Sequence, residues 1–442
     1  MALDIFKLKE NNTKPRTEIL SGFTTFMTMS YIIFVQPVVL SIAGMDAGAV
    51  MVATCISSAV GTLLMGLFAN YPIALAPAMG HNFFFAITVA TIMHIPWQAA
   101  LGATFISGVL FLILSIFGLR ETIINAIPSS LKNSIAVGIG FLIALVGFEW
   151  GGIVVANPGT LVALGDLTSP PVALTLFGLA LIAILMALKV RGSIIIGILA
   201  TAVVGLPFSL TTFHGVFAAP PSISPTLFKL DIMGTVNLGV LSVIFVFFFL
   251  DLFDTVGTLI GVSEKAGFID EKGNLPRARR ALLSDATATV IGALLGTSTV
   301  TSYIESATGV AEGGRTGLSN VVTATLFILA LFTYPLVKMI GGGYAVTEGV
   351  VMYPAIAPAL IIVGSLMLSG VKKIDWEDVT ESIPAFLTII IMPITVSITE
   401  GIAMGFISYA ALKLVSGKGK EVHWLLYTFA VLFVLRYIFL KA

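Results

Sequence analysis

The sequence predicts an all-α polytopic membrane protein with about fourteen transmembrane segments. Of its 442 residues, 57% are hydrophobic and only 10% are charged, whereas about a quarter of the residues of a soluble domain are charged. Between Ala47 and Leu119 there is no Asp, Glu, Lys or Arg, and this length accommodates about three crossings of roughly 20 residues each. The apolar runs are continuous rather than alternating, which excludes a membrane β-barrel.

Apolar runs between charged residues define the expected spans. They are residues 17–40, 49–69, 72–93, 97–117, 133–155, 171–188, 193–209, 237–262, 281–297, 300–314, 318–338, 350–370, 383–398 and 400–416. A further apolar stretch at residues 424–440 contains Arg436, and it fits either an interfacial helix or an additional span. The main body of the chain is therefore expected to cross the bilayer fourteen times.

The basic residues support this count, because cytoplasmic loops carry an excess of Lys and Arg. With a cytoplasmic N-terminus, nineteen basic residues fall on the inner side and only two, Lys229 and Lys338, on the outer side. A missed or invented crossing in the middle of the chain would destroy this asymmetry. We therefore expect a multi-pass protein of the plasma (inner) membrane, with both ends of the fourteen-span body in the cytoplasm.

The longest outer connection divides the spans into seven and seven. It covers residues 209–236 and contains Pro220, Pro221 and Pro225. An odd number of spans per half places the halves in opposite orientations, as in the inverted repeats of many secondary transporters. The expected units are residues 1–208, the connection 209–236, residues 237–416, and a tail at residues 417–442.

Two spans, one in each half, are interrupted. The third contains Pro72, Pro77 and Gly80, and the tenth begins with the hydroxyl-rich stretch at residues 297–302. Non-helical backbone at membrane depth is tolerated only inside protein or beside a water-filled cavity. Paired interruptions are the best sequence indication of a binding site near the membrane midplane, so we expect short extended strands and a ligand site here.

Acidic residues deep in two spans are candidates for that site, because ionisable groups at membrane depth are costly and often functional. Asp251, Asp254 and Thr258 share one face of the eighth span, and Glu305 lies at the interruption of the tenth. A carboxylate accepts adjacent N–H donors, which suits the edge of a planar heterocycle. The alternatives are an interhelical hydrogen bond for Asp251 or Asp254, and capping of the following short helix for Glu305.

Three residues of the interrupted third span could complete the site. Asn82 offers a donor and an acceptor, and Phe83 could stack on a base, although an aromatic residue here could equally be core or lipid-facing. His81 could relay a proton or be structural. Asp285, in the ninth span, could neutralise nearby arginines, which would make it structural.

Several classes of function are excluded by composition and motifs. The 23 basic and 23 acidic residues cancel, so nothing indicates a nucleic-acid partner. A single cysteine, Cys55, excludes a multi-cysteine metal site, and the sequence contains no GxxxxGK[ST], HExxH or GxSxG motif. We expect no cofactor, no metal and no enzymatic activity.

Three stretches resemble a known family. APAMGHNFFF (76–85), LDLFDTVGTLIGV (250–262) and TSTVTSYIESATGVAEGGRTGLSN (297–320) are similar to signatures of the AzgA-like hypoxanthine/adenine/guanine permeases of the nucleobase–ascorbate transporter superfamily. The resemblance covers nearly the whole chain. It implies the fold of the bacterial uracil permease, with seven plus seven inverted repeats, short strands in the third and tenth spans, and a core domain that moves against a gate domain within a homodimer.

The resemblance also implies site residues. By motif, the substrate-binding positions are Asp254, Thr258, Glu305, Ile304, Asn82, Phe83 and Thr25. Thr258 stands where the uracil permease has a histidine. His81 stands where many relatives have leucine, which leaves the preferred purine open.

The functional hypothesis is a secondary active importer of purine nucleobases such as adenine, guanine or hypoxanthine. A neutral base can be concentrated only with a co-transported cation, and a carboxylate that takes up a proton with the substrate would couple the two. The proton-coupling candidates are Asp254, Glu305, Asp251 and His81, with sodium as the alternative ion. The rival hypotheses are a uracil or xanthine carrier, and an anion carrier or channel of the same fold.

Overall fold

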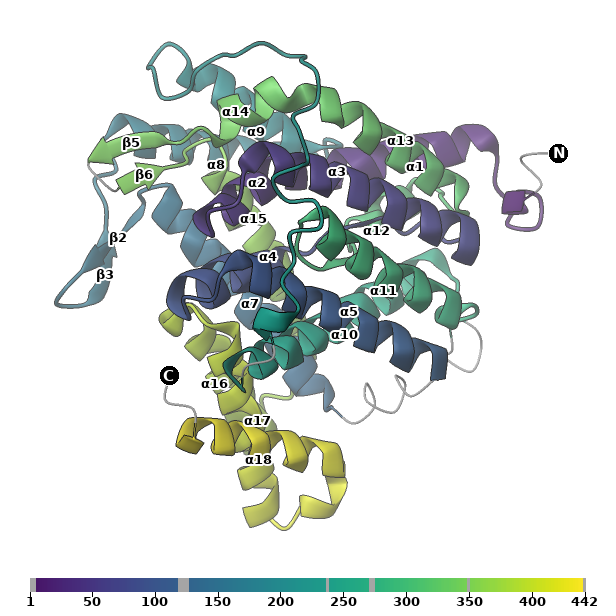
Figure 1. The fold of residues 1–442 in the computed structure, drawn as a ribbon, viewed down its shortest axis with the longest axis vertical. Coiled ribbons are helices and arrows are strands. Elements are labelled where there is room, and N and C mark those ends of the chain that lie inside the picture. Colours follow the sequence, from purple (N-terminus) through teal and green to yellow (C-terminus); the bar gives the residue numbers. More distant parts are fainter. Residues whose placement is uncertain (1–4, 118–126, 236–237, 270–274, 348–349, 440–442) are drawn as a thin grey trace.

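The fold is predominantly helical, as the sequence predicts (Figure 1). The computed structural model describes residues 5–117, 127–235, 238–269, 275–347 and 350–439. Among these residues, eight helices are long and apolar enough to cross a membrane: Pro15–Ile42, Ala47–Ala69, Trp97–Phe117, Ser129–Trp150, Pro170–Ala187, Val243–Ala266, Leu318–Gly341 and Ile398–Val415. Each coincides with an expected span.

The first half of the chain has a helix or an interrupted segment at every expected span. Its elements are α1 (Pro15–Met29), α2 (Ile32–Ile42), α3 (Ala47–Leu64), β1 (Leu75–Pro77), α4 (Met79–Phe83), which continues as a π-helix over Phe84–Ile92, α5 (Trp97–Phe117), α7 (Ser129–Trp150), β2 (Val154–Asn157), β3 (Leu161–Leu164), α8 (Pro170–Ala187) and α9 (Ser193–Gly205). Helices α1 and α2 form one segment that is broken at Ser30 and Tyr31.

The second half has a corresponding order. Its elements are α10 (Leu238–Ala266), α11 (Ala278–Leu295), β4 (Val300–Ser302), α12 (Ser306–Ala311), α13 (Leu318–Ala330), α14 (Tyr334–Gly341), β5 (Tyr344–Thr347), β6 (Val350–Met352), α15 (Ala357–Met367), α16 (Val379–Thr395), α17 (Ile398–Val415) and α18 (Trp424–Phe439). In both halves the third segment is a short strand followed by a short helix, as expected for an inverted repeat. The repeat boundaries stay a prediction, and the boundary at residues 236–237 lies outside the described residues. Two of the basic residues that we assigned to the inner side, Arg120 and Lys272, also lie outside the described residues.

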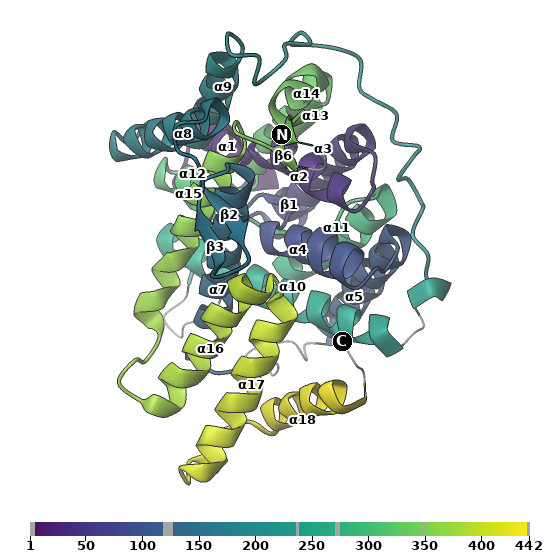
Figure 2. The same cartoon turned by 90° about the vertical axis from the view of Figure 1, so that its left-hand side faces the viewer.

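The helices form two groups, which correspond to the core and gate domains. In the core group, α11 packs against α3 and α5, and α13 packs against α1 and α3. In the gate group, α7 packs against α15 and α16, and α8 packs against α9 and α15. Figure 2 shows the groups side by side, with α8, α9, α16 and α17 on the left and α3, α5 and α11 on the right. Each group therefore combines helices from both halves of the chain.

Two β-hairpins lie where we expected the end of one span or the start of another. Strands β2 and β3 pair antiparallel, and the Asn157 side chain accepts bonds from Gly159 N and Thr160 N at 2.8 and 3.2 Å. Strands β5 and β6 also pair, so the expected twelfth span at residues 350–370 is wrong at its start, because α15 begins at Ala357. The apolar residues of β2 and β6 extend the apolar runs from which we predicted the spans at residues 133–155 and 350–370.

A polar cluster joins the ends of α16 and α17 in the gate group. Lys413 is buried and lies 2.8 Å from the Glu381 carboxylate, which also accepts a hydrogen bond from the Tyr409 hydroxyl at 2.8 Å. Asp378 pairs with Lys418 at 2.7 Å. The hydrogen bonds from Lys418 and Thr380 hold the pKa of the Asp378 carboxyl well below its usual range.

The tail helix α18 packs against α17 and lies across it in Figure 1. Near the start of α18, the Tyr427 hydroxyl bonds to Gly419 O at 2.9 Å, and Phe429 and Phe433 pack on Phe406 of α17. Near its end, Arg436 pairs with Glu400, in the first turn of α17, at 2.8 Å. The end of α18 therefore lies beside the start of α17, an arrangement that favours an additional span over an interfacial helix.

This geometry predicts that the two ends of α18 are reached from opposite sides of the membrane. Single cysteines at Ser416→Cys and Ile438→Cys should react with a membrane-impermeant maleimide from opposite faces of sealed vesicles. The native Cys55 is buried, so the unsubstituted chain is the background control. Labelling of both positions from the same face would contradict the crossing.

Candidate functional site

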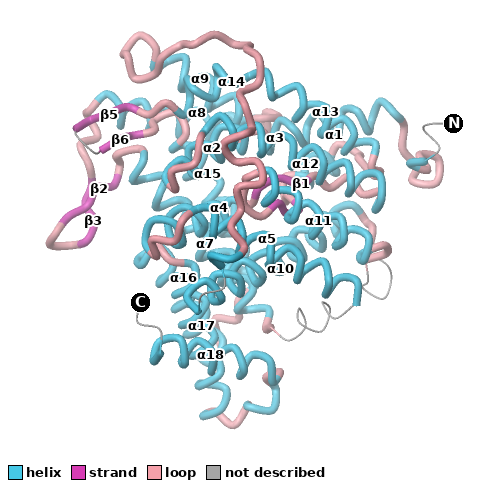
Figure 3. Tube along the Cα trace, in the orientation of Figure 1, coloured by secondary structure: helices cyan, strands magenta, loops and turns pink. Residues whose placement is uncertain are grey.

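Strands β1 and β4 meet in the middle of the helical body. They pair antiparallel, with Leu75 opposite Ser302 and Pro77 opposite Val300. Backbone bonds of 2.9 Å from Ala78 N to Thr299 O and from Tyr303 N to Ala74 O lengthen the pair at both ends. Figure 3 shows β1 enclosed by helices, whereas β2, β3, β5 and β6 lie at one edge of the molecule.

Side chains satisfy the backbone groups that the strand pair leaves over. Leu75 N donates to Thr62 Oγ1 at 2.9 Å, Ala74 N donates to Ser306 Oγ at 3.0 Å, and the Asn320 amide donates to Ile73 O at 2.7 Å. Buried backbone groups without partners are costly in an apolar environment. These polar residues of the neighbouring helices therefore make the two strands possible at membrane depth.

Asp254 projects from α10 onto the strand pair. Its Oδ2 accepts a hydrogen bond from Thr301 Oγ1, in the centre of β4, at 3.3 Å. Thr258, one turn further along α10, is buried. Asp254 and Thr258 thus both lie on the side of α10 that faces the protein interior.

Asp251 and Asp285 lie behind β4 and are fully buried. Asp285 Oδ1 accepts bonds from Ser302 N and Ser302 Oγ, both at 2.9 Å, and Oδ2 accepts one from Thr255 Oγ1 at 2.7 Å. The Thr255 hydroxyl is also 3.3 Å from Asp251 Oδ1. Asp285 therefore anchors the end of β4, which is a structural role with different partners from the arginines that we expected.

Glu305 stands between β4 and α12 and is held from the first segment. Its Oε1 accepts a hydrogen bond from the Tyr31 hydroxyl at 2.7 Å. Although Glu305 occupies the N-cap position of α12, its side chain does not cap that helix, so the capping alternative is wrong. Ile304, the predicted neighbour of Glu305 in the site, is 51% exposed.

Helix α1 packs along α12. The hydroxyls of Thr28 and Thr308 are 3.0 Å apart, and the buried Thr25 contacts Gly309, where a β-carbon would collide with its hydroxyl. The predicted first-span residue Thr25 therefore contacts the helix that follows Glu305 rather than Glu305 itself.

Asn82 belongs to a buried amide network on the other side of the strands. Its Oδ1 accepts a short hydrogen bond from Ser298 Oγ, and Ser298 Oγ accepts one from Gln36 Nε2 at 3.1 Å. Gln36 Nε2 also lies 3.0 Å from Thr297 Oγ1. Among the described residues, Asn82 Nδ2 and Gln36 Oε1 have no hydrogen-bond partner, so one donor and one acceptor remain unused in this network.

His81 and Phe83 flank Asn82 but face different neighbours. His81 is buried, and its ring is nearly parallel to that of Phe247, with 6.5 Å between the ring centroids. Neither of the His81 nitrogens has a hydrogen-bond partner among the described residues. Phe83 is fully buried, and its ring centroid lies 6.2 Å from that of Trp150 in α7. It therefore lies at the contact between core and gate groups and does not face lipid.

Two carboxylates and an amide thus surround the strand pair. Neither Asp254 nor Glu305 takes part in an ion pair with a described residue. Hydroxyl groups donate the hydrogen bonds that these carboxylates receive. Such a constellation offers acceptors for N–H groups and provides no positive charge for an anion.

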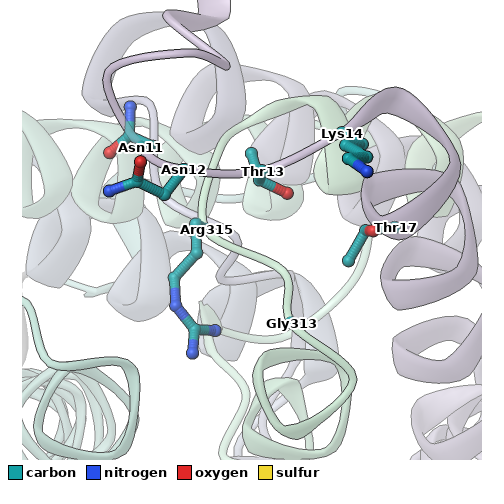
Figure 4. A pocket seen from close by; sticks show the side chains of 7 residues that line it. All are labelled: Asn11, Asn12, Thr13, Lys14, Thr17, Gly313 and Arg315. Atoms are coloured by element: carbon teal, nitrogen blue, oxygen red, sulfur yellow. The ribbon is translucent and has the colours of Figure 1, made fainter.

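A surface cavity of about 510 Å³ lies apart from this site (Figure 4). Its lining residues are Asn11, Asn12, Thr13, Lys14, Thr17, Gly313 and Arg315, of which Lys14 and Arg315 are cationic. The Arg315 guanidinium bonds to Val310 O at 2.8 Å and Gly314 O at 2.7 Å. Arg315 is thus engaged at the end of α12.

Sequence reasoning missed three residues of the constellation: Tyr31, Gln36 and Ser298. Tyr31 and Gln36 lie in an apolar span without an acidic residue nearby, and their partners are more than 260 positions away in the chain. The available signals were Gln36 itself, a polar residue at membrane depth, and the hydroxyl-rich stretch that contains Ser298.

The fold is similar to that of solved membrane transporters. The transmembrane domain of the cyanobacterial bicarbonate transporter BicA matches with a TM-score of 0.61 at 13% identity, covering 88% of this chain and 96% of that one. SLC26A9 matches with a TM-score of 0.61 at 10% identity, covering 91% and 65%. At such low identity the likeness shows the fold alone, which is that of a transporter with seven plus seven inverted repeats, as predicted.

Sequence comparison gives the family. A protein of Methanocaldococcus jannaschii is 53% identical over 437 residues, covering 99% of this chain and 98% of the relative. The adenine permease AdeP of Escherichia coli is 46% identical, covering 99% and 96%, and the guanine/hypoxanthine permease PbuG of Bacillus subtilis is 47% identical, covering 99% of each chain.

The model of the Permease family matches residues 16–404. The chain belongs to this family, which confirms the recognition made from its motifs. It is a membrane transporter and not an enzyme.

The amide network predicts that Ser298→Ala destabilises the protein. The substitution removes the common partner of Gln36 and Asn82, and a buried polar group that loses its partner costs about 1–3 kcal/mol. The apparent melting temperature in detergent should fall by several degrees. Ser416→Ala, at an exposed serine, is the control and should melt like the wild type; an equal melting temperature for Ser298→Ala would contradict the network.

Proposed function

We propose that this permease is a secondary active importer of purine nucleobases such as adenine, guanine or hypoxanthine, driven by the proton gradient through alternating access. The site residues proposed for the base are Asp254, Glu305, Asn82, Phe83, Thr258, Thr25 and the Ile304 backbone. The observation that carries the proposal is the pair of carboxylates, Asp254 and Glu305, held beside opposed strands without a cationic partner among the described residues.

The chemistry of the substrate supports this assignment. A purine presents N–H donors and ring-nitrogen acceptors at its edge, and these complement carboxylate oxygens and the unused Nδ2 and Oε1 atoms of the amide network. The relatives named for adenine and for guanine and hypoxanthine are 46% and 47% identical over nearly the whole chain. Both lines lead to a neutral base.

An anion carrier of the same fold is the rival function. It would need a basic residue or bare helix ends without nearby carboxylates, whereas Asp254 and Glu305 would repel a negative charge in a low-dielectric site. A uracil or xanthine carrier is the nearer rival, and competition by unlabelled bases distinguishes it from a purine carrier.

The neutrality of the substrate supports coupling to a cation, for which we propose the proton. An uncharged base gains nothing from the membrane potential alone, so its accumulation requires a co-transported cation. Asp254 and Glu305 are the proposed proton carriers; Asp251 and His81 are the further candidates, and sodium is the alternative ion.

The proposed arrangement in the membrane has a cytoplasmic N-terminus, supported by the nineteen to two distribution of basic residues. We also propose a homodimer, which the resemblance to the uracil permease implies, and repeats at residues 1–208 and 237–416, which the count of seven spans in each half supports.

Uptake into proteoliposomes tests the function. Radiolabelled adenine, guanine and hypoxanthine should accumulate when the lumen is alkaline relative to the outside, with or without sodium, because protons then flow inward with the base. Accumulation that depends on sodium and does not respond to the pH gradient would show that sodium, not the proton, is the coupling ion. Absence of uptake for all three purines, with uptake of bicarbonate or another anion, would overturn the proposal.

Glu305→Gln should abolish purine uptake while the protein still inserts in the membrane. The amide keeps the size of the side chain but has one acceptor oxygen and no exchangeable charge. Glu10→Gln, in an exposed pair with Lys7, is the matched control. Unchanged uptake by Glu305→Gln at normal protein levels would remove Glu305 from the site.

A further inference from the structure

The first transmembrane segment is broken where it meets the proposed site. Helix α1 ends at Met29 and α2 begins at Ile32, with Ser30 and Tyr31 between them. The Tyr31 side chain is 1% exposed, and its hydroxyl reaches Glu305 across 274 positions of the chain. The break thus aligns a tyrosine hydroxyl with the carboxylate between β4 and α12.

The bond from Tyr31 divides the Glu305 carboxylate into two unequal oxygens. Oε1 accepts from Tyr31 at 2.7 Å, and no other described side chain donates to this carboxylate. A hydrogen bond to an ionised acceptor is shorter and about twice as strong as a neutral one. Oε2 is therefore the oxygen left to face a ligand, in an orientation that the buried tyrosine fixes.

Holding Glu305 in this way has an energetic consequence. A free glutamate side chain loses up to about 2 kcal/mol of rotamer entropy when it becomes ordered, and a site that is ordered beforehand does not incur that loss on binding. Tyr31 is ordered by its own burial. The hydrogen bond from Tyr31 should therefore increase the affinity of the site for the base.

We propose that Tyr31 is a positioning residue that holds Glu305 so that Oε2 receives an N–H group of the purine. This role rests on the proposed function and deepens it. This role differs from a contribution of Tyr31 to core packing, because it depends on the hydrogen bond from the Tyr31 hydroxyl to one oxygen of Glu305.

Tyr31→Phe tests the role in full-length protein reconstituted in proteoliposomes. The KM for the best-transported purine should rise about tenfold, which corresponds to about 1.4 kcal/mol, while the maximal rate stays within about twofold. Tyr409→Phe is the matched control, because it removes another tyrosine–glutamate bond of 2.8 Å, at the ends of α16 and α17. An unchanged KM for Tyr31→Phe, or an equal rise for Tyr409→Phe, overturns the proposal.

A double-mutant cycle separates positioning from packing. In a Glu305→Asp background the shortened carboxylate cannot reach the Tyr31 hydroxyl, so adding Tyr31→Phe should change the Kd for purine by less than about twofold. The same tenfold loss in that background would show that Tyr31 acts otherwise and would overturn the proposal. A wild type that neither binds nor transports purines overturns the proposed function as well, so the two failures are distinguishable.

A spectroscopic readout remains valid even if Tyr31→Phe fails to fold. With 3-fluorotyrosine placed at Tyr31, the ring and its hydroxyl are retained. Its fluorine resonance should shift when purine is added to the otherwise native protein, and it should also shift on Glu305→Gln without purine. The absence of either shift contradicts a link from Tyr31 through Glu305 to the base.

Discussion

The pairing of β1 with β4 is the constraint on which the rest of the structure depends. Two strands at membrane depth expose peptide groups that lipid cannot satisfy. The strands satisfy part of this demand through each other, and Thr62, Ser306, Asn320 and Asp285 satisfy more of it. This accounts for a concentration of polar residues in the middle of an otherwise apolar protein.

The same constraint places the carboxylates. Asp285 is used to hold Ser302 at the end of β4, whereas Asp254 receives one weak bond from Thr301 at 3.3 Å and Glu305 one bond from Tyr31. A fully bonded acid is structural, and a partly bonded acid retains acceptor capacity for a ligand. We therefore propose that the number of bonds at each carboxylate separates the structural acid from the acids that bind the base.

Much of the fold could be predicted from the sequence because its signals are local. Continuous apolar runs and the asymmetry of basic residues locate the spans, and Pro72, Pro77 and Gly80 locate the interruption of the third. The hairpins were missed, since the valines of β2 and β6 extend apolar runs. Tyr31 and Gln36 were missed because only folding brings them to partners far away in the chain.

The most direct measurement is a structure of the protein with a purine bound. The account predicts electron density for the base beside the paired strands, with ring N–H groups within hydrogen-bond distance of Asp254 and of Glu305 Oε2, and with Tyr31 still bonded to Oε1. A base bound elsewhere, with both carboxylates occupied only by protein donors, would contradict the central claim.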